Sequence, residues 1–179
     1  AVYIQKNEKN REVVIPIKNI ISVDGGKVKY TSDEGGKTKS ISCTVGAPLI
    51  YNGVTTKQVF DKSLTDGKLG DVKLLSNDGS ASPDVIFVEA YTNYIAAGTD
   101  EADSILYDMY DLSKKIVLDT TEDDPYTIIY DGDGSECGIE NIKKDDIVSV
   151  FNSPADAYQK YIRAYISNHT ETGQISYTE

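Results

Sequence analysis

The chain has 179 residues, and its 18 lysines and arginines are outnumbered by 29 aspartates and glutamates, which gives a formal net charge of −11. Such a charge repels a phosphate backbone, so we expect no nucleic-acid partner. No apolar run approaches the roughly 18 residues of a membrane span, so we expect no membrane-spanning segment. The first residues, AVYIQKNEKN, lack the pattern of a signal peptide.

The composition favours β-structure. Thirteen tyrosines stand against three phenylalanines and no tryptophan, and valine and isoleucine are frequent. Tyrosine and β-branched residues fit half-buried pleated surfaces better than helices. Glycine clusters at Asp24-Gly25-Gly26, Gly35-Gly36 and Asp78-Gly79 mark turns at short intervals. Short apolar runs between turns predict an all-β chain.

The expected strands follow one another along the whole chain. In chain order they lie at 13–22, 27–31 and 37–44, at the Tyr51-Asn52-Gly53 turn, at 69–75, 85–94, 104–110 and 114–120, at the Tyr130-Asp131-Gly132 turn, and at 144–150. Alternation is visible where Ile147, Ser149 and Phe151 share one side of a strand.

The stretch 153–168 carries conflicting signals. Ser153 and Pro154 resemble a helix start, and Tyr158, Tyr161, Ile162, Tyr165 and Ile166 follow helical spacing. The segments that it matches elsewhere in the chain, 84–93 and 13–22, are rich in β-branched residues, and Pro16 would interrupt a helix. We therefore expect a turn at Ser153-Pro154 and a strand from about Tyr161.

The chain also matches itself. Segment 47–53 matches 124–132 with Tyr51 on Tyr130, 69–75 matches 144–150, and 85–94 matches 159–168 with Tyr91 on Tyr165. A partial third copy places Val2-Tyr3-Ile4 on Val72-Lys73-Leu74, and 26–31 resembles 173–178. Because strand edges must be paired or closed, the repeat predicts tandem small β-barrel or sandwich modules. We expect residues 1–26 to be the second half of a preceding repeat, followed by modules at 27–98 and 99–179, with the strand 173–178 beginning a further repeat.

Few residues are candidates for chemistry. The acidic run 131–142 resembles a calcium loop at Asp131 and Asp133 but has Glu136 and Ile142 where glycine and glutamate are needed. A turn is the favoured interpretation and adventitious cation binding the alternative; 119–124 and 99–103 are interpreted as solvated acidic loops. The single histidine, His169, is expected in an exposed loop. Cys43 and Cys137 are too few for a disulfide framework and are either independent thiols or a pair. No catalytic, cofactor-binding or metal-binding residue is predicted.

Tyrosines are the only candidates for a binding face. Five of them cluster in matched segments: Tyr91, Tyr94, Tyr158, Tyr161 and Tyr165. Aromatic faces stack on sugars and fill protein interfaces, although packing within and between the repeats is the favoured interpretation of these rings.

The segment DDIVSVFNSPADAYQKYIRAYISNHTETGQI at 145–175, and its counterparts over most of the chain, resemble the β-repeat modules of large secreted and S-layer-associated proteins of Clostridium-like Firmicutes, which often carry S-layer homology domains. The resemblance implies an exported, wall-associated segment without catalytic residues. No S-layer homology motif occurs in this chain.

These observations predict a non-catalytic structural or spacer repeat segment of a larger bacterial cell-surface or secreted protein. Its partners would be neighbouring modules of the same polypeptide, and it would need no cofactor. The alternative is a module that binds cell-wall polysaccharide or a protein through the tyrosine-rich face. An enzyme would require a cleft at the junction of the repeats that holds acids with perturbed pKa values.

Overall fold

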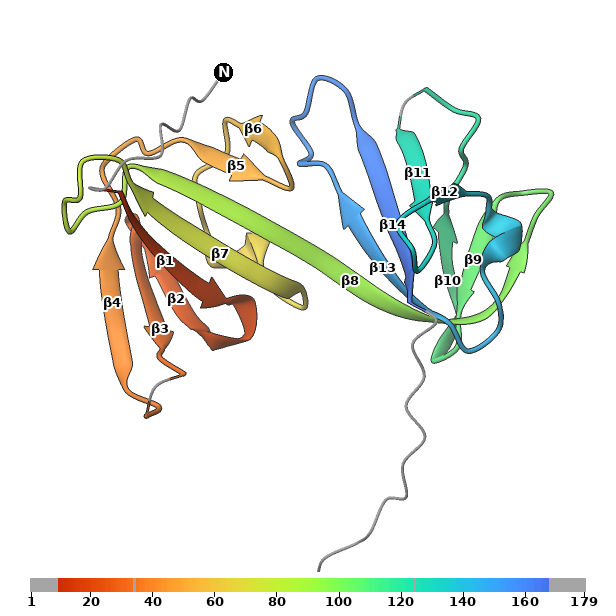
Figure 1. Cartoon of the computed structure of the whole chain (residues 1–179), viewed down its shortest axis with the longest axis horizontal. Helices are drawn as coiled ribbons and strands as arrows, with labels where there is room; N and C mark the ends of the chain where they lie inside the picture. Colours follow the sequence, from red (N-terminus) through yellow and green to blue (C-terminus); the bar gives the residue numbers. More distant parts are fainter. Residues whose placement is uncertain (1–9, 34, 124, 168–179) are drawn as a thin grey trace, which may run out of the picture. The chain divides into compact units, whose positions relative to one another are not determined.

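The computed structural model describes residues 10–33, 35–123 and 125–167, and in these ranges the chain is almost entirely β-structure and turns (Figure 1). The all-β prediction is confirmed. The first strands are β1 (Arg11–Pro16), β2 (Ile20–Asp24), β3 (Lys27–Thr31), β4 (Thr38–Ser42), β5 (Leu49–Tyr51), β6 (Val54–Thr56), β7 (Leu69–Ser76) and β8 (Val85–Asp100). They are followed by β9 (Ile105–Asp108), β10 (Asp111–Val117), β11 (Tyr126–Tyr130), β12 (Glu136–Cys137), β13 (Ile147–Asn152) and β14 (Tyr161–Ser167). Short 3₁₀ helices occur at η1 (Ile17–Asn19), η2 (Lys62–Leu64) and η3 (Ile139–Asn141).

Contacts divide the chain into two compact units. Unit 1 holds the residues up to Thr92 together with Pro125–Tyr126 and Phe151–Ile162. Unit 2 holds Asn93–Asp123, Thr127–Val150 and the described residues from Arg163 onward. The boundary therefore falls inside β8, and unit 1 includes a segment from late in the sequence.

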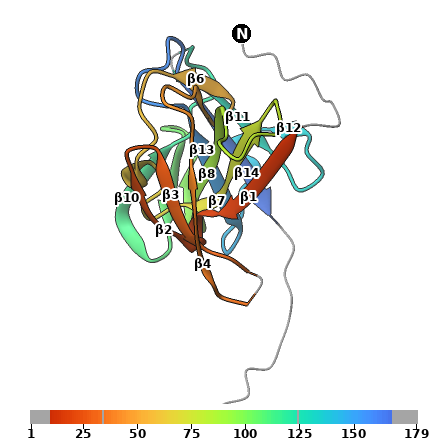
Figure 2. The same ribbon diagram turned by 90° about the vertical axis from the view of Figure 1, so that its left-hand side faces the viewer.

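Unit 1 is built from two sheets. In the larger one, β7 pairs antiparallel with β1, from Arg11↔Ser76 to Pro16↔Asp71, and with the first half of β8. The hairpin β5–β6 adds parallel to β8 through the pair Leu49↔Ile86. The smaller sheet is β2–β3–β4, which Figure 2 shows from the side of unit 1.

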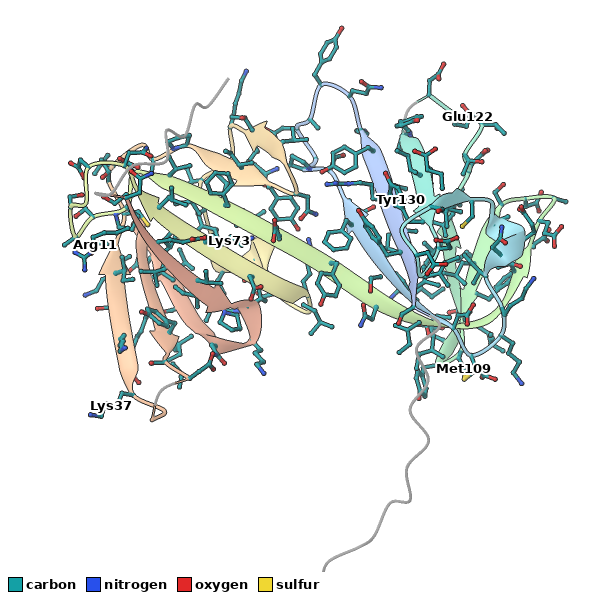
Figure 3. The ribbon with its side chains drawn as sticks, viewed as in Figure 1. Arg11, Lys37, Lys73, Met109, Glu122 and Tyr130 are labelled. Atoms are coloured by element: carbon teal, nitrogen blue, oxygen red, sulfur yellow. The ribbon has the colours of Figure 1, made fainter. Side chains whose placement is uncertain are left out.

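Both sheets of unit 1 contribute to one hydrophobic core. It includes Ile15, Ile20, Val28, Tyr30, Leu49, Tyr51, Phe60, Val72, Leu74, Ile86 and Val88. In β7 the alternation is strict, because Val72 and Leu74 are fully buried whereas Lys73 points outward to an exposed ion pair with Glu89 of β8, 2.9 Å away (Figure 3). Removal of this apolar surface from water stabilises the two layers.

Unit 2 has its own core and hairpins. The second half of β8 pairs with β9, and β9 pairs with β10. β13 lies beside β8, where the Ala96 amide donates to the Asp146 carbonyl at 2.8 Å and the Asp145 amide donates to the Ala96 carbonyl at 2.8 Å. β14 lies between β13 and the β11–β12 hairpin. The buried side chains are Leu106, Leu118, Ile129, Val148, Val150, Ala164 and Ile166.

The conflict at 153–168 is resolved in favour of a turn and a strand. The Ala157 amide donates to the Pro154 carbonyl at 3.0 Å, which closes the turn. β14 begins at Tyr161, where the Tyr161 amide donates to Ser153 Oγ at 3.1 Å. The strand prediction is confirmed. The helical spacing of the tyrosines does not produce a helix here, because strand pairing outweighs local helix propensities, which differ by tenths of a kcal/mol per residue.

The sequence predicts barrel or sandwich modules, and no closed barrel forms in the described residues. β2 and β4 end the smaller sheet without pairing with each other, and within these ranges β1 pairs with β7 alone. Edges such as β4 and β10 carry lysines at Lys39, Lys114 and Lys115, and charged side chains protect an open edge without closure.

The tyrosines that the sequence superposes lie in different surroundings. Tyr51 is 4% exposed in the core of unit 1, whereas Tyr130 is half-buried and stacks on Tyr165 with ring centroids 4.8 Å apart. The alignment of Tyr51 with Tyr130 is therefore wrong as a residue-by-residue match. The segments Val2-Tyr3-Ile4 and 173–178 lie outside the described residues.

Candidate functional site

The turn of the β5–β6 hairpin places a buried polar side chain, Asn52, in unit 1. Asn52 has φ +48° and Gly53 has φ +88°, the left-handed pair that a tight two-residue hairpin requires. Asparagine and glycine tolerate this conformation better than other residues. The local sequence Tyr-Asn-Gly thus explains the turn itself.

Asn52 is also 3% exposed, and its side chain is bonded on both ends. Nδ2 donates to the carbonyls of Ala90 at 2.9 Å and Asn152 at 2.8 Å, and Oδ1 accepts from the Ala90 amide at 2.8 Å. The Asn52 amide donates to the Val88 carbonyl at 2.8 Å, and its carbonyl accepts from the Tyr161 hydroxyl. One side chain therefore fixes the hairpin both to β8 and to a segment 100 positions later.

A carboxylate makes a second attachment between the same two regions. Asp156 Oδ1 accepts from Thr56 Oγ1 at 2.5 Å and from Gln58 Nε2 at 3.2 Å, and Oδ2 accepts from the Lys57 amide at 2.8 Å. The hydrogen bond from Thr56, followed by that from the Lys57 amide, holds the pKa of Asp156 below its usual value. We call Asn52, Thr56, Asn152, Asp156 and Tyr161 the clasp.

The clasp is suited to holding two segments together rather than to catalysis. The lowered pKa makes Asp156 a poor proton acceptor at neutral pH. The side-chain amide of Asn52 is buried, and both its nitrogen and its oxygen form hydrogen bonds with backbone groups. These hydrogen bonds hold the fold together and are not available to a substrate.

The pH dependence of the clasp can be tested with Asp156→Asn. A carboxyl whose folded pKa lies below the unfolded value of about 3.9 stabilises the fold above that pH, and the contribution is lost as the pH falls through the folded pKa. We expect the wild type to exceed Asp156→Asn in free energy of unfolding at pH 7 and the difference to shrink below about pH 4. Urea titrations at several pH values measure it. Glu101→Gln, which makes the same charge change on an exposed loop residue, serves as control. A difference in free energy of unfolding between the wild type and Asp156→Asn that stays constant with pH would contradict the stabilising role of the Asp156 carboxylate.

The five predicted binding tyrosines are divided between the units. In unit 1, Tyr91 packs against Phe151 with ring centroids 4.9 Å apart and ring planes tilted by 34°. The Tyr161 hydroxyl donates to the Asn52 carbonyl, and Tyr158 is fully exposed. In unit 2, Tyr94 lies under Lys114 Nζ at 4.7 Å, and Tyr165 stacks on Tyr130, which is labelled in Figure 3. Four of the five therefore have intramolecular ring or hydroxyl contacts, and Tyr158 presents its whole ring to solvent.

The acidic candidates form turns. Asp131 Oδ1 accepts from the Asp133 and Ser135 amides, both at 2.9 Å. Asp100 Oδ1 accepts from the Ala102 amide at 3.1 Å, and Asp119 Oδ1 from the Thr121 amide at 2.8 Å. Among residues 10–33, 35–123 and 125–167, no three histidine, cysteine or acidic side chains gather in a way that could hold a metal ion. His169 lies outside the described residues.

The two cysteines are free thiols in different units. Burial raises the pKa of both, and Asp131 and Glu140 raise that of Cys137 further. The reactive thiolate is therefore disfavoured at each position. Cys43 lines an open, mainly apolar pocket of about 420 Å³ with Val45, Val59 and Phe60.

Neither the sequence nor the fold identifies a relative of this chain. The sequence matches no known protein family and no characterised protein, and the fold matches no solved structure. No helix in the described part of the chain is long and apolar enough to cross a membrane.

Sequence reasoning located the Asn52 turn and the Pro154 turn but missed the clasp that joins them. The partners lie about 100 residues apart, and an Asn-Gly turn carries no mark of what its side chain will meet. The turn already accounts for an asparagine at this position, because the turn needs its left-handed conformation. The residue type is therefore a weak indication that its side chain also makes long-range hydrogen bonds.

Proposed function

We propose that the chain is a non-catalytic structural segment made of tandem β repeats, and that it spaces or connects other parts of a larger bacterial cell-surface or secreted protein. The observation that carries the proposal is that the two halves of the chain use the same elements in the same order. β3, β4, β5, β6, η2, β7 and β8 are followed by β9, β10, β11, β12, η3, β13 and β14.

Strand registers support the same correspondence. β2 pairs with β3 from Ile20↔Tyr30 to Asp24↔Lys27, and the register shifts directly after Ile20. β8 pairs with β9 from Ala96↔Asp108 to Asp100↔Ile105, with the shift directly after Ala96. Bulges are placed by specific side-chain and backbone requirements, so a bulge at the same step favours a duplicated unit.

Buried positions support a revised alignment of the copies. Val72 and Leu74 of β7 correspond to Val148 and Val150 of β13, all of them at most 2% exposed. Leu49 of β5, 2% exposed, corresponds to Ile129 of β11, 1% exposed. This alignment matches inward faces, which the superposition of Tyr51 on Tyr130 does not.

β8 has a role in both copies. It closes the first copy as the partner of β7 and opens the second as the partner of β9. Successive copies would then be joined through a strand rather than through a flexible linker, which suits a segment that carries load or sets distance. The clasp supports this interpretation, because it holds the loop after β13 on the hairpin of the earlier copy.

The cellular setting is proposed from the resemblance to S-layer-associated repeat modules. The net charge of −11 supports it, since negative charge keeps an exported array soluble.

A mechanical assay with a binding control tests the proposal. We expect the full chain, pulled by its ends, to resist extension, and Asn52→Ala to lower the unfolding force while Tyr158→Ser leaves it unchanged. We also expect no saturable binding to purified wall polysaccharide. Unfolding without resistance would contradict the structural proposal, and saturable binding abolished by Tyr158→Ser would favour the binding module instead.

A further inference from the structure

Unit 1 contains a pocket that has no part in the proposed structural function. Its volume of about 420 Å³ falls within the roughly 300–1,000 Å³ that is typical of small-molecule sites. The core residues Leu49, Phe60 and Ile86 line it and are at most 5% exposed. Val45 and Val59 line it too and are 100% and 80% exposed, so the apolar lining continues out to the surface. A small apolar body fits such a pocket.

Unit 2 has a leucine where unit 1 has a pocket-lining cysteine. The Cys43 amide donates to the Gly26 carbonyl at 2.9 Å, and the Leu118 amide donates to the Ser104 carbonyl at 2.8 Å. Each bond joins the residue before a strand pair to the residue after it, β3 and β4 in unit 1 and β9 and β10 in unit 2. Leu118 is 1% exposed, whereas Cys43 is half-buried and lines the pocket. The shorter side chain therefore leaves space for an aliphatic group in unit 1.

The charge at the pocket is positive. Lys57 is the one charged residue among those that line it, and its ammonium forms no ion pair among the described residues. Asp156 does not line the pocket, and its charge is offset by hydrogen bonds from Thr56, from the Lys57 amide and from Gln58. An ammonium beside apolar surface favours a ligand that carries a carboxylate.

We propose that this pocket binds a short aliphatic monocarboxylate, with its alkyl chain against Cys43, Val45 and Phe60 and its carboxylate beside Lys57. Removal of the alkyl chain from water supplies most of the affinity, and the charge pair sets the preference for an acid. The match of Cys43 with Leu118 uses the repeat proposed above, whereas the pocket and Lys57 belong to unit 1 alone.

NMR titration of the full chain with hexanoate tests the proposal. We expect saturable shifts of the amides at 43–47 and 58–60, with a dissociation constant of about 1 mM, as for a ligand of this size. Hexanol has the same alkyl chain without the charge, and we expect it to bind about two- to fivefold more weakly, the worth of an exposed ion pair. Hexylamine, with the opposite charge, is expected to bind more weakly than hexanol.

Two variants test the two parts of the pocket. Cys43→Leu introduces the side chain that unit 2 has, and we expect it to weaken hexanoate binding about tenfold or more because it takes the space of the alkyl chain. Cys137→Leu, at the half-buried cysteine of unit 2, is its control and leaves binding unchanged. Lys57→Gln abolishes the preference for hexanoate over hexanol, whereas Lys37→Gln, at an exposed lysine that does not line the pocket, preserves it.

Three results would overturn the inference. They are no saturable shift of the pocket amides at about ten times the expected dissociation constant, undiminished binding in a folded Cys43→Leu variant, and hexylamine binding as tight as that of hexanoate. Because the three probes are compared on the wild type, poor folding of a variant does not prevent a decision. The structural proposal is judged by its unfolding force, so failure of hexanoate binding is distinguishable from failure of that proposal.

Discussion

Asn52→Ala is expected to lower the free energy of unfolding by about 3 to 5 kcal/mol, since each buried group left without its partner costs about 1–3 kcal/mol. The substitution removes the donors to the carbonyls of Ala90 and Asn152 and the acceptor for the Ala90 amide. It also places alanine at φ +48°, which adds about 1 kcal/mol of strain. Urea unfolding of the full chain, followed by circular dichroism, measures the change.

Two matched variants separate these causes. Asn52→Gly relieves the backbone strain but leaves the same groups unpaired, so we expect it to recover only about 1 kcal/mol. Asn19→Ala removes an exposed asparagine hydrogen bond, Nδ2 to Asp33 Oδ1 at 2.6 Å, and is expected to cost less than about 1 kcal/mol. Equal losses for Asn52→Ala and Asn19→Ala would show that the clasp has no special role in stability.

Gly70→Ala is the second substitution with a large expected effect. Gly70, in β7, has φ +113°, and a Cβ there would stand 1.9 Å from the Glu89 carbonyl oxygen of the paired strand. A backbone atom cannot swing aside as a side chain can, so β7 and β8 would have to separate locally. We expect a loss of about 3 kcal/mol or more, of the size found for strained or overpacked positions.

Gly67→Ala is the control for Gly70→Ala. Gly67 has φ +68°, and a Cβ there would meet nothing within 4 Å. Its cost is limited to left-handed strain of about 1 kcal/mol. The difference in free energy of unfolding between the two alanine variants measures the effect of the close approach of β7 and β8. Equal losses for the two variants would contradict a steric conflict at Gly70.

The sequence was sufficient for the fold class and for several boundaries. The tyrosine-rich, β-branched composition predicted an all-β chain, and comparison of 153–168 with its matched segments placed a strand at Tyr161, where β14 begins. These features are encoded by nearby residues. The Asn52 turn is of the same kind, because Asn-Gly fixes a hairpin by its own backbone preferences.

Residue-level register could not be obtained in this way. Side chains in a strand alternate between faces, so an alignment that is shifted by one residue exchanges inside and outside. Tyr51 and Tyr130 look equivalent in sequence, yet Tyr51 is in the core and Tyr130 stacks near the surface on Tyr165. Leu49 and Ile129, the inward-facing residues that the proposed alignment matches, share no conspicuous residue type.

Sheet closure and the clasp could not be predicted from the sequence for a different reason. Both depend on which distant segments meet, and Thr56 and Asp156 are 100 positions apart. In the part of the chain that the structure describes, β4 and β10 are edge strands that carry lysines, and charged side chains protect an open edge without closure into a barrel. Periodicity alone does not reveal this.

Native-state hydrogen exchange on Val72→Ala tests most directly whether the chain is the connected structural segment of repeats that we propose. Val72 is fully buried in unit 1, and its truncation leaves a cavity. If successive copies share β8, the amides of Val148 and Leu106 in unit 2 lose protection together with those of unit 1 as low concentrations of urea are added. Unchanged protection of Val148 and Leu106, with a loss confined to unit 1, would contradict a shared strand and with it the tandem structural array.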